Sequence, residues 1–221
     1  MKKMHFILLL VTLIAGAVQA QVTRPTVARK KVMMNPVPPP PPPAPAPAAT
    51  PTAPPPASKP APVFSLTGVL VRVGTGADNK ESPSAVTMNL YNVTTGRICF
   101  QQATPINTLF DAGSDLTFRL VKFSRPGIPA QEITNSLLLS SLQSKGTRFE
   151  ISYAPNFILD AWSVRGVTLT LEIKDQYGNA HPTLNNKVIA FNTAIGMMDA
   201  GKQYLKCYID GDFNALNAAF N

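Results

Sequence analysis

The sequence predicts an all-β fold: an antiparallel β-sandwich of about eight strands with one or two short helices, preceded by a disordered proline-rich arm. From residue 63 onward, apolar and polar residues alternate over several short segments, as in strands with one buried and one solvated face. Turn segments rich in Gly, Asn and Pro separate these runs. Before residue 63 the alternation is absent and proline dominates.

The first 20 residues have the three parts of a secretory signal peptide. Lys2 and Lys3 form a basic start, Phe6 to Val18 is uncharged and mostly apolar, and Val18-Gln19-Ala20 suits a signal peptidase. A helix over this apolar run would rise about 20 Å, less than the roughly 30 Å core of a bilayer. We expect a cleaved signal, a periplasmic or secreted chain, and no transmembrane segment in the mature protein. An uncleaved membrane anchor is the alternative.

Residues 21–62 hold 16 of the 22 prolines, including the unbroken run from Pro38 to Pro43. Consecutive prolines fix φ and remove backbone donors, which excludes helix and sheet. We expect a semi-stiff polyproline II arm that holds the following domain away from its anchor point. The predicted organisation is therefore a signal peptide over 1–20, a basic proline-rich linker over 21–62 and a β-sandwich domain over 63–221.

The formal net charge of +8 does not indicate a nucleic-acid-binding domain. Seven of the 20 Lys and Arg residues precede residue 63, and no Asp or Glu does. The β domain holds 13 Lys and Arg against 12 Asp and Glu and is nearly neutral. A nucleic-acid-binding domain needs its positive charge on the folded surface, so we expect no nucleic-acid partner.

The clearest predicted strand is Gly166–Lys174, in which every second residue is apolar without a slip. Apolar residues at helical spacing predict a short helix within Ala130–Ser144, and a turn at Asp210 predicts a second one over Phe213–Phe220. The other predicted strands are Phe64–Val73, Val86–Leu90, Arg97–Gln101, Leu116–Leu120, Phe149–Tyr153, Lys187–Asn192 and Gln203–Ile209.

Both cysteines, Cys99 and Cys207, lie in the predicted β domain. In an exported chain an even number of cysteines favours a disulfide. Closing this long loop would stabilise the domain by roughly 4–5 kcal/mol in the chain-entropy model. Two unpaired buried thiols are the alternative and would suit a cytosolic protein better. We predict the Cys99–Cys207 disulfide.

The most polar loop follows the first predicted strand and offers the hard oxygen ligands that calcium prefers. Carboxylates from other loops are candidate further ligands. Lys80 inside the loop lowers its negative charge, so a flexible surface turn is the alternative. Calcium is the only cofactor that the sequence suggests. The candidate calcium ligands are Asp78, Asn79, Glu81, Asp160 and Asp175.

Trp162, the only tryptophan, stands just before the clearest strand and is a candidate binding residue if exposed. Buried, it would pack in the core, which is the commoner place. His181 is the only histidine after residue 20, and no Gly-x-Ser-x-Gly turn accompanies it. Zinc needs several His or Cys ligands. We therefore expect no enzyme.

These features favour a non-catalytic binding module of the cell envelope, displayed on its proline-rich spacer. It would recognise an envelope polymer or protein through loops at one end of the sandwich. A structural or assembly subunit that pairs through a sheet edge is the alternative. The least favoured alternative is a small secreted hydrolase that uses His181 with Asp78 or Asp160.

Overall fold

The computed structural model describes residues 59–192 and 195–221. The predicted signal peptide lies outside the described residues, as does the proline-rich segment up to residue 58. Within the described part the chain forms ten strands and two short helices, and all strand pairs are antiparallel, which confirms the all-β prediction. The elements are β1 (Phe64–Thr75), β2 (Ala85–Asn92), β3 (Arg97–Gln101), β4 (Asp115–Lys122), α1 (Ala130–Leu137), α2 (Leu139–Lys145), β5 (Thr147–Ala154), β6 (Trp162–Asp175), β7 (Lys187–Phe191), β8 (Gly196–Met198), β9 (Tyr204–Ile209) and β10 (Ala215–Phe220).

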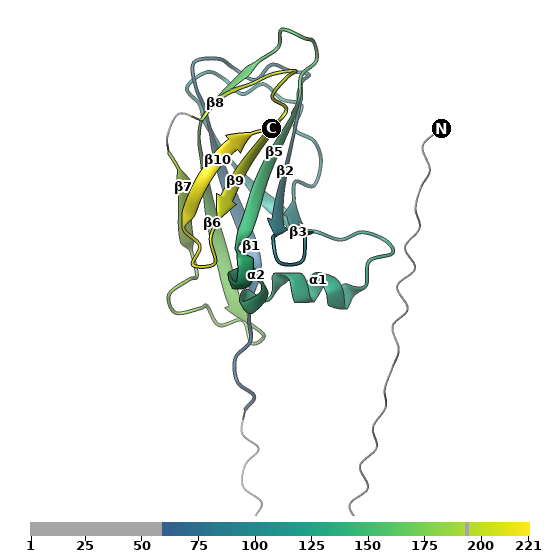
Figure 1. The fold of residues 1–221 in the computed structure, drawn as a ribbon, viewed down its shortest axis with the longest axis vertical. Helices are drawn as coiled ribbons and strands as arrows, with labels where there is room; N and C mark the ends of the chain where they lie inside the picture. Colours follow the sequence, from purple (N-terminus) through teal and green to yellow (C-terminus); the bar gives the residue numbers. More distant parts are fainter. Residues whose placement is uncertain (1–58, 193–194) are drawn as a thin grey trace, which may run out of the picture. The chain divides into compact units, whose positions relative to one another are not determined.

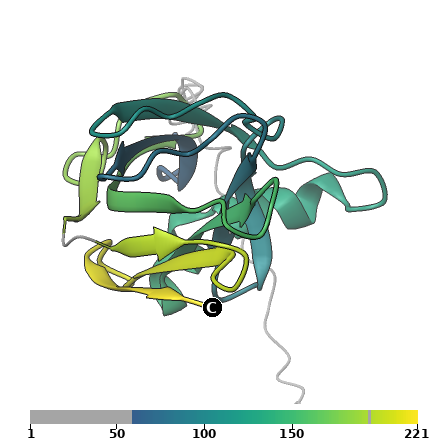
Figure 2. The same cartoon turned by 90° about the horizontal axis from the view of Figure 1, so that it is seen from above.

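The strands follow one path, β10-β9-β5-β2-β3-β4-β1-β6-β7, with β8 beside β6. This sheet folds into two layers, one of β4, β1, β6 and β7 and the other of β3, β2, β5, β9 and β10. The layers are joined where Phe100 and Gln101 of β3 pair with Lys122 and Val121 of β4. Seen from above, the strands surround a common interior (Figure 2). The sandwich is therefore nearly closed and resembles a barrel.

Inward-facing side chains of both layers fill the interior. Along β6, Val167, Leu169, Leu171 and Ile173 are buried, while the residues between them are partly exposed. Burying each such side chain stabilises the fold by roughly 1.5–3 kcal/mol. The alternation in the sequence thus marks the residues that face the core.

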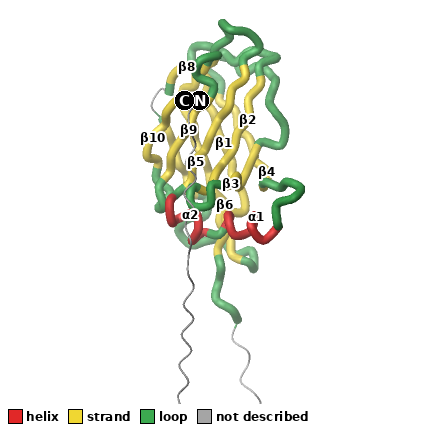
Figure 3. Tube along the Cα trace, turned by 45° about the vertical axis from the view of Figure 1, so that its right-hand side comes forward, coloured by secondary structure: helices red, strands yellow, loops and turns green. Residues whose placement is uncertain are grey.

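The loops gather at two ends because neighbouring strands are antiparallel. Phe64, where β1 begins, pairs with Asp175 at the last position of β6, so the described chain begins at this end. Here α1 and α2 cover the domain, and we call it the helix end (Figures 1 and 3). The opposite end, the loop end, consists of the loops 76–84, 102–114, 155–161 and 199–203.

The predicted helix over Ala130–Ser144 is divided in two at Leu138. The backbone of Leu138 is extended (φ −59°, ψ 133°) and forms an isolated bridge with Ser65 of β1. On either side of the break, Leu137 and Leu142 are buried in the core. No helix among the described residues is long and apolar enough to cross a membrane.

The predicted second helix over Phe213–Phe220 is wrong, because this segment contains strand β10. Asp210 does organise a turn, since its Oδ1 accepts hydrogen bonds from the backbone N–H groups of Asp212 (2.9 Å) and Asn214 (2.8 Å). After this turn the chain pairs with β9, where Ala218 lies opposite Cys207. The open edge of β9 therefore overrides the weak helical pattern of the last residues.

The predicted disulfide is not formed: Cys99 and Cys207 are both free and buried. Cys99 lies on β3 and Cys207 on β9, and β2 and β5 separate these strands. Three ladder spacings amount to roughly 14 Å along the sheet, whereas a disulfide needs Cα atoms within about 7 Å. One argument for an oxidising compartment is thereby removed, and the prediction of export rests on the N-terminal segment alone.

Candidate functional site at the loop end

The predicted calcium ligands do not come together. Asp78, Asn79, Glu81 and Asp160 belong to loops at the loop end, but Asp175 ends β6 at the helix end. The 14 residues of β6 separate the two ends by roughly 40 Å. Asp175 instead organises a turn there. Burial acts to raise the pKa of its carboxyl, but hydrogen bonds hold that pKa below its usual value. The side-chain amide of Asn179 donates to Oδ2, and the backbone N–H groups of Tyr177 and Asn179 donate to Oδ1.

No group of three or more His, Cys, Asp or Glu side chains in the described ranges is arranged to hold a metal ion. At the loop end one of the fully buried side chains is a cation, Lys80, which is 0% exposed. The sequence predicted this lysine as a surface charge that weakens a metal loop. The structure places it inside, where it supplies positive charge itself.

Lys80 connects two loops. Its Nζ donates hydrogen bonds to the backbone carbonyl of Glu81 (2.9 Å) and to that of Thr108 (2.8 Å), 28 residues away. Its backbone forms an isolated bridge with Phe110, through N–H···O bonds of 3.1 and 3.0 Å. Burial lowers the pKa of the Lys80 amine, and the nearby carboxylate of Asp160 partly offsets this effect.

Asp160 connects the first of these loops to a third. Its buried carboxylate accepts hydrogen bonds from the Ser84 hydroxyl and from the backbone N–H of Asn156 (3.2 Å). The Ser84 oxygen also accepts the Asn156 N–H, at 3.1 Å. Tyr153 is buried beside them, and its pKa is raised by burial and by Asp160. We call Lys80, Ser84 and Asp160 the polar lock, because they fix the loops 76–84, 102–114 and 155–161 to one another.

The loop 155–161 presents three consecutive large apolar side chains to solvent. Phe157 is 48% exposed, Ile158 80% and Leu159 83%. The loop turns back below them, since the backbone N–H of Asp160 donates to the carbonyl of Phe157 (3.1 Å). These three residues form what we call the apolar tip, which lies at the end of the domain farthest from β1's first residue (Figure 1).

Trp162 is not available to a ligand, because it is 0% exposed. Its ring packs against Phe110 (centroids 5.4 Å apart) and Tyr153 (5.9 Å), and its Nε1 donates to the Thr75 hydroxyl at 3.3 Å. Of the two alternatives, the core position, which the sequence favoured, is confirmed, and Trp162 is not an exposed binding residue. Trp162 supports the loop end from below.

The remaining charged side chains of the loop-end loops are mostly acidic. Four carboxylates at exposed or partly exposed positions stand against one exposed lysine, so these loops together carry a net negative charge at their surface. These residues are Asp78, Glu81, Asp111, Asp199 and Lys202.

His181 lies at the helix end, where its ring meets that of Phe64 edge-on with centroids 4.5 Å apart. Its Nδ1 accepts the backbone N–H groups of Thr183 (3.3 Å) and Leu184 (3.1 Å). The length of β6 separates it from Asp78 and Asp160. The structure therefore does not bring His181 together with Asp78 or Asp160.

Neither the apolar tip nor the burial of Lys80 was predicted from the sequence. A signal for the tip is present: Phe157, Ile158 and Leu159 form an apolar run between loop residues, with Pro155-Asn156 before it and Asp160 after it. A run of three apolar residues in a loop has no place in a core and indicates a contact surface.

The comparisons with protein-family models, with curated proteins and with solved structures find no match to this chain, so its function has to be argued from its own residues.

Proposed function

We propose that this protein is a non-catalytic binding module of the cell envelope that docks to an envelope protein through the apolar tip. The observation that carries the proposal is the exposure of Ile158 and Leu159, 80% and 83%, next to each other in one loop. Large apolar side chains that lie in water lose free energy when a partner covers them, at roughly 25 cal/mol per Å².

The polar lock supports this proposal because it makes the tip rigid before binding. Ser84 and Asp160 hold the base of the tip loop, and Lys80 holds the neighbouring loops. A preorganised loop loses little conformational entropy on binding, so more of the contact energy appears as affinity. Flexible loops with the same three side chains would bind more weakly.

The acidic surroundings favour a protein partner over a phospholipid surface. Asp78, Glu81 and Asp111 would face the head groups if the tip entered a membrane, and anionic lipids would repel them. A protein with an apolar pocket and a basic rim complements both features. The predicted proline-rich spacer precedes β1 in the chain, and the first residue of β1 lies at the end of the domain opposite the tip.

The test compares the full chain with a double variant, Ile158→Ser plus Leu159→Ser, in binding to envelope fractions of the source cells. We expect at least a tenfold loss of binding, since each large apolar side chain that a partner buries contributes roughly 1.5–3 kcal/mol. The thermal midpoint should stay close to that of the parent chain, because neither side chain packs in the core. The matched control is Val121→Ser, which removes an exposed apolar side chain from β4.

The class of partner is tested in the same assay. Protease treatment of the envelope fraction should abolish binding, and vesicles of phosphatidylglycerol and phosphatidylethanolamine should not replace it. Binding that survives protease treatment would exclude a protein partner. Equal binding of the double variant and the parent chain would exclude the apolar tip as the docking surface.

A second candidate function, an assembly subunit that pairs through a sheet edge, is favoured by the orientation of the two edge strands. β7 and β10 end the strand path, and nine antiparallel strands in a row make these two edges run in the same direction. No backbone hydrogen bond joins them among the described residues, and a cavity of about 440 Å³ lies between them. An extended segment antiparallel to both could pair with either edge.

Charged residues on an edge strand oppose pairing with another chain. We therefore expect Val188→Lys or Leu216→Lys to abolish any concentration-dependent self-association seen by analytical ultracentrifugation. Both side chains are exposed, at 57% and 63%. A chain that stays monomeric up to about millimolar concentration, and that no partner strand protects from hydrogen exchange at β7 or β10, would exclude this function.

A further inference from the structure

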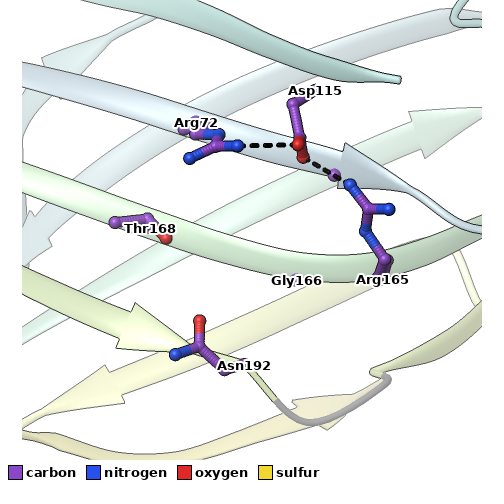
Figure 4. A pocket seen from close by; sticks show the side chains of 7 residues that line it. Arg72, Asp115, Arg165, Gly166, Thr168 and Asn192 are labelled. Carbon is purple, nitrogen blue, oxygen red and sulfur yellow. Dashed lines mark hydrogen bonds and ion pairs between the residues drawn. The ribbon is translucent and has the colours of Figure 1, made fainter. Parts of the chain in front are cut away.

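A second surface feature lies on the outer face of β4, β1 and β6, near the loop-end ends of these strands. The carboxylate of Asp115 is shared by two arginines: its Oδ2 lies 2.7 Å from Nη2 of Arg72, and its Oδ1 lies 2.8 Å from Nη2 of Arg165. Figure 4 shows the two guanidinium groups reaching Asp115 from opposite sides. Both arginines keep the carboxyl ionised, since their hydrogen bonds lower the pKa of Asp115.

The three charges do not cancel. Two guanidinium groups against one carboxylate leave a net charge of +1, and the arginine side chains are 60% and 49% exposed. Among the described residues, the Arg72 side chain makes one hydrogen bond, the one to Asp115. Most N–H donors of a guanidinium therefore remain open to a ligand at this position.

A neighbouring pair on the same face shows the contrast. Arg119 of β4 donates two hydrogen bonds to Glu172 of β6, one to each carboxylate oxygen, at 2.8 and 2.6 Å. This bidentate pair is neutral and uses the arginine fork fully. Arg72 and Arg165 are arranged differently, because one carboxylate divides its two oxygens between them.

The two arginines border a depression of about 260 Å³, and two of its lining residues are glycines, which have no side chain. Gly74 of β1 lies opposite Gly166 of β6, next to a bulge that adds Arg165 to the strand. A Cβ atom at Gly74 would lie 2.8 Å from Oδ1 of Asp115, and one at Gly166 would lie 3.1 Å from the Phe191 carbonyl oxygen. Larger residues at either position would disturb or fill the site.

Polar side chains complete the border. Thr168 of β6 and Asn192, which follows β7, lie on the side of the depression opposite Asp115 (Figure 4). A hydroxyl and an amide are groups that bind sugar hydroxyls, whereas guanidinium groups bind carboxylate and phosphate oxygens. The depression thus offers donors for an oxyanion and hydrogen-bonding partners for the unit that carries it.

We propose that this depression binds an oxyanion on a hydroxylated unit, such as a uronate or a phosphorylated sugar of an envelope polymer. Arg72 and Arg165 contact the oxyanion, and Thr168 and Asn192 contact the hydroxyl groups. Binding here is independent of docking through the apolar tip. The protein would then hold a polymer on its side while its tip contacts a protein.

The test titrates the full chain with oligogalacturonate, with inorganic polyphosphate and with neutral dextran oligomers, followed by ¹H–¹⁵N spectra. The backbone N–H signals of Gly74 and Gly166 should shift with an anionic ligand and not with dextran. Arg72→Gln and Arg165→Gln should each weaken binding about tenfold, the loss expected for one charge-assisted hydrogen bond. Arg119→Gln is the matched control, because it removes the same charge from the same face. Only screened long-range charge is lost in this variant, so its affinity should change less than about threefold.

The two anionic ligands distinguish a carboxylate site from a phosphate site, and binding of either one supports the proposal. Equal weakening by Arg119→Gln would show a diffuse charge effect and overturn it, as would the absence of shifts at both glycines. The double variant at Ile158 and Leu159 should bind the anion normally. The docking assay and the anion titration therefore test the two proposals independently, and either proposal can fail without the other.

Discussion

At the helix end, apolar side chains of α1 and α2 point inward and seal the core. At the loop end, a buried amine, a carboxylate and a hydroxyl close the domain, while three large apolar side chains point outward. Leu142 is 0% exposed and Leu159 is 83% exposed, although both belong to segments between strands. The loop end thus buries the polar lock of Lys80, Ser84 and Asp160 and exposes apolar side chains, whereas the hydrophobic effect alone would favour the opposite placement.

If the proposed docking function holds, this difference separates an end shaped by stability from an end shaped by recognition. Buried polar groups cost free energy unless all of them have partners, so a network such as the polar lock fixes one geometry at the expense of stability. Exposed apolar residues add nothing to the folded state. The loop end therefore combines two features that stability alone does not explain, and a rigid docking surface explains both.

The largest expected effect concerns the cysteines, which lie in the half of the sheet near the helix end. We expect both thiols to react with a disulfide reagent at least about a thousandfold more slowly in the native chain than in the denatured chain, because both are buried and need large-scale opening. The denatured, unreduced chain should release two thiols. A count of zero would show that the predicted disulfide forms after all.

The same thiols predict a pH dependence of stability. Burial raises the pKa of Cys99 to about 11 and that of Cys207 to about 12, above their ordinary value of 9.0. Their contribution to the free energy of unfolding is therefore fully present below pH 9 and is lost as the pH rises toward 11 and 12. Urea titrations between pH 8 and 11 should show this fall, and a Cys99→Ala, Cys207→Ala variant should show less of it.

The next effect is a matched pair of substitutions at the two ends. Leu142→Ala should lower the free energy of unfolding by about 3 kcal/mol, since it opens a cavity in the core. Leu159→Ala makes the same chemical change at the apolar tip and should stay within about 0.5 kcal/mol of the parent chain. Urea denaturation measures both. Similar losses for the two variants would mean that the tip packs against the domain in solution.

The sequence was sufficient for features that depend on neighbours along the chain. Val167 to Ile173 alternate without a slip, and this segment became the central part of β6. The sequence pattern gave a wrong helix over Phe213–Phe220, because this segment pairs with the open edge of β9 as a strand. Local pattern carries no information about such an edge.

The position of the candidate site at one end of the sandwich could be predicted from the sequence, but the contacts that its side chains make could not. The polar loop with Asp78 and Glu81 was correctly located at one end, yet its chemistry depends on Lys80, whose partner Thr108 lies in another loop. Charged residues are rarely buried, so composition alone assigns this lysine to the surface. The prediction of a Cys99–Cys207 disulfide was wrong because the order of the strands in the sheet, which local sequence patterns do not give, sets the distance between the two cysteines.

A smaller effect tests the polar lock itself. Lys80→Met keeps the length and apolar stem of the side chain but removes the amine, so the carbonyls of Glu81 and Thr108 lose their donor. Both hydrogen bonds are only partly buried, so each carbonyl that loses its donor costs up to about 1–3 kcal/mol, the range for a buried group. Part of this cost is relieved because the burial of the charged amine, which lowers its pKa, is also removed. We expect a net loss of about 1–2 kcal/mol in the free energy of unfolding.

The loss from Lys80→Met should be local. Two backbone N–H groups should exchange with solvent faster in the variant: that of Phe110, which donates to the Lys80 carbonyl, and that of Ser163, which donates to the Asp78 carbonyl. The N–H groups of the helix end should exchange at the same rate as in the parent chain. Lys202→Met, an exposed lysine of the same end, is the control and should leave exchange unchanged. Because the lock positions the tip, Lys80→Met should also weaken docking even though the tip residues are intact. If docking is unchanged although the loops exchange faster, the tip binds without preorganisation. The proposed contrast between the two ends would then depend only on the exposed apolar side chains and not on the polar lock.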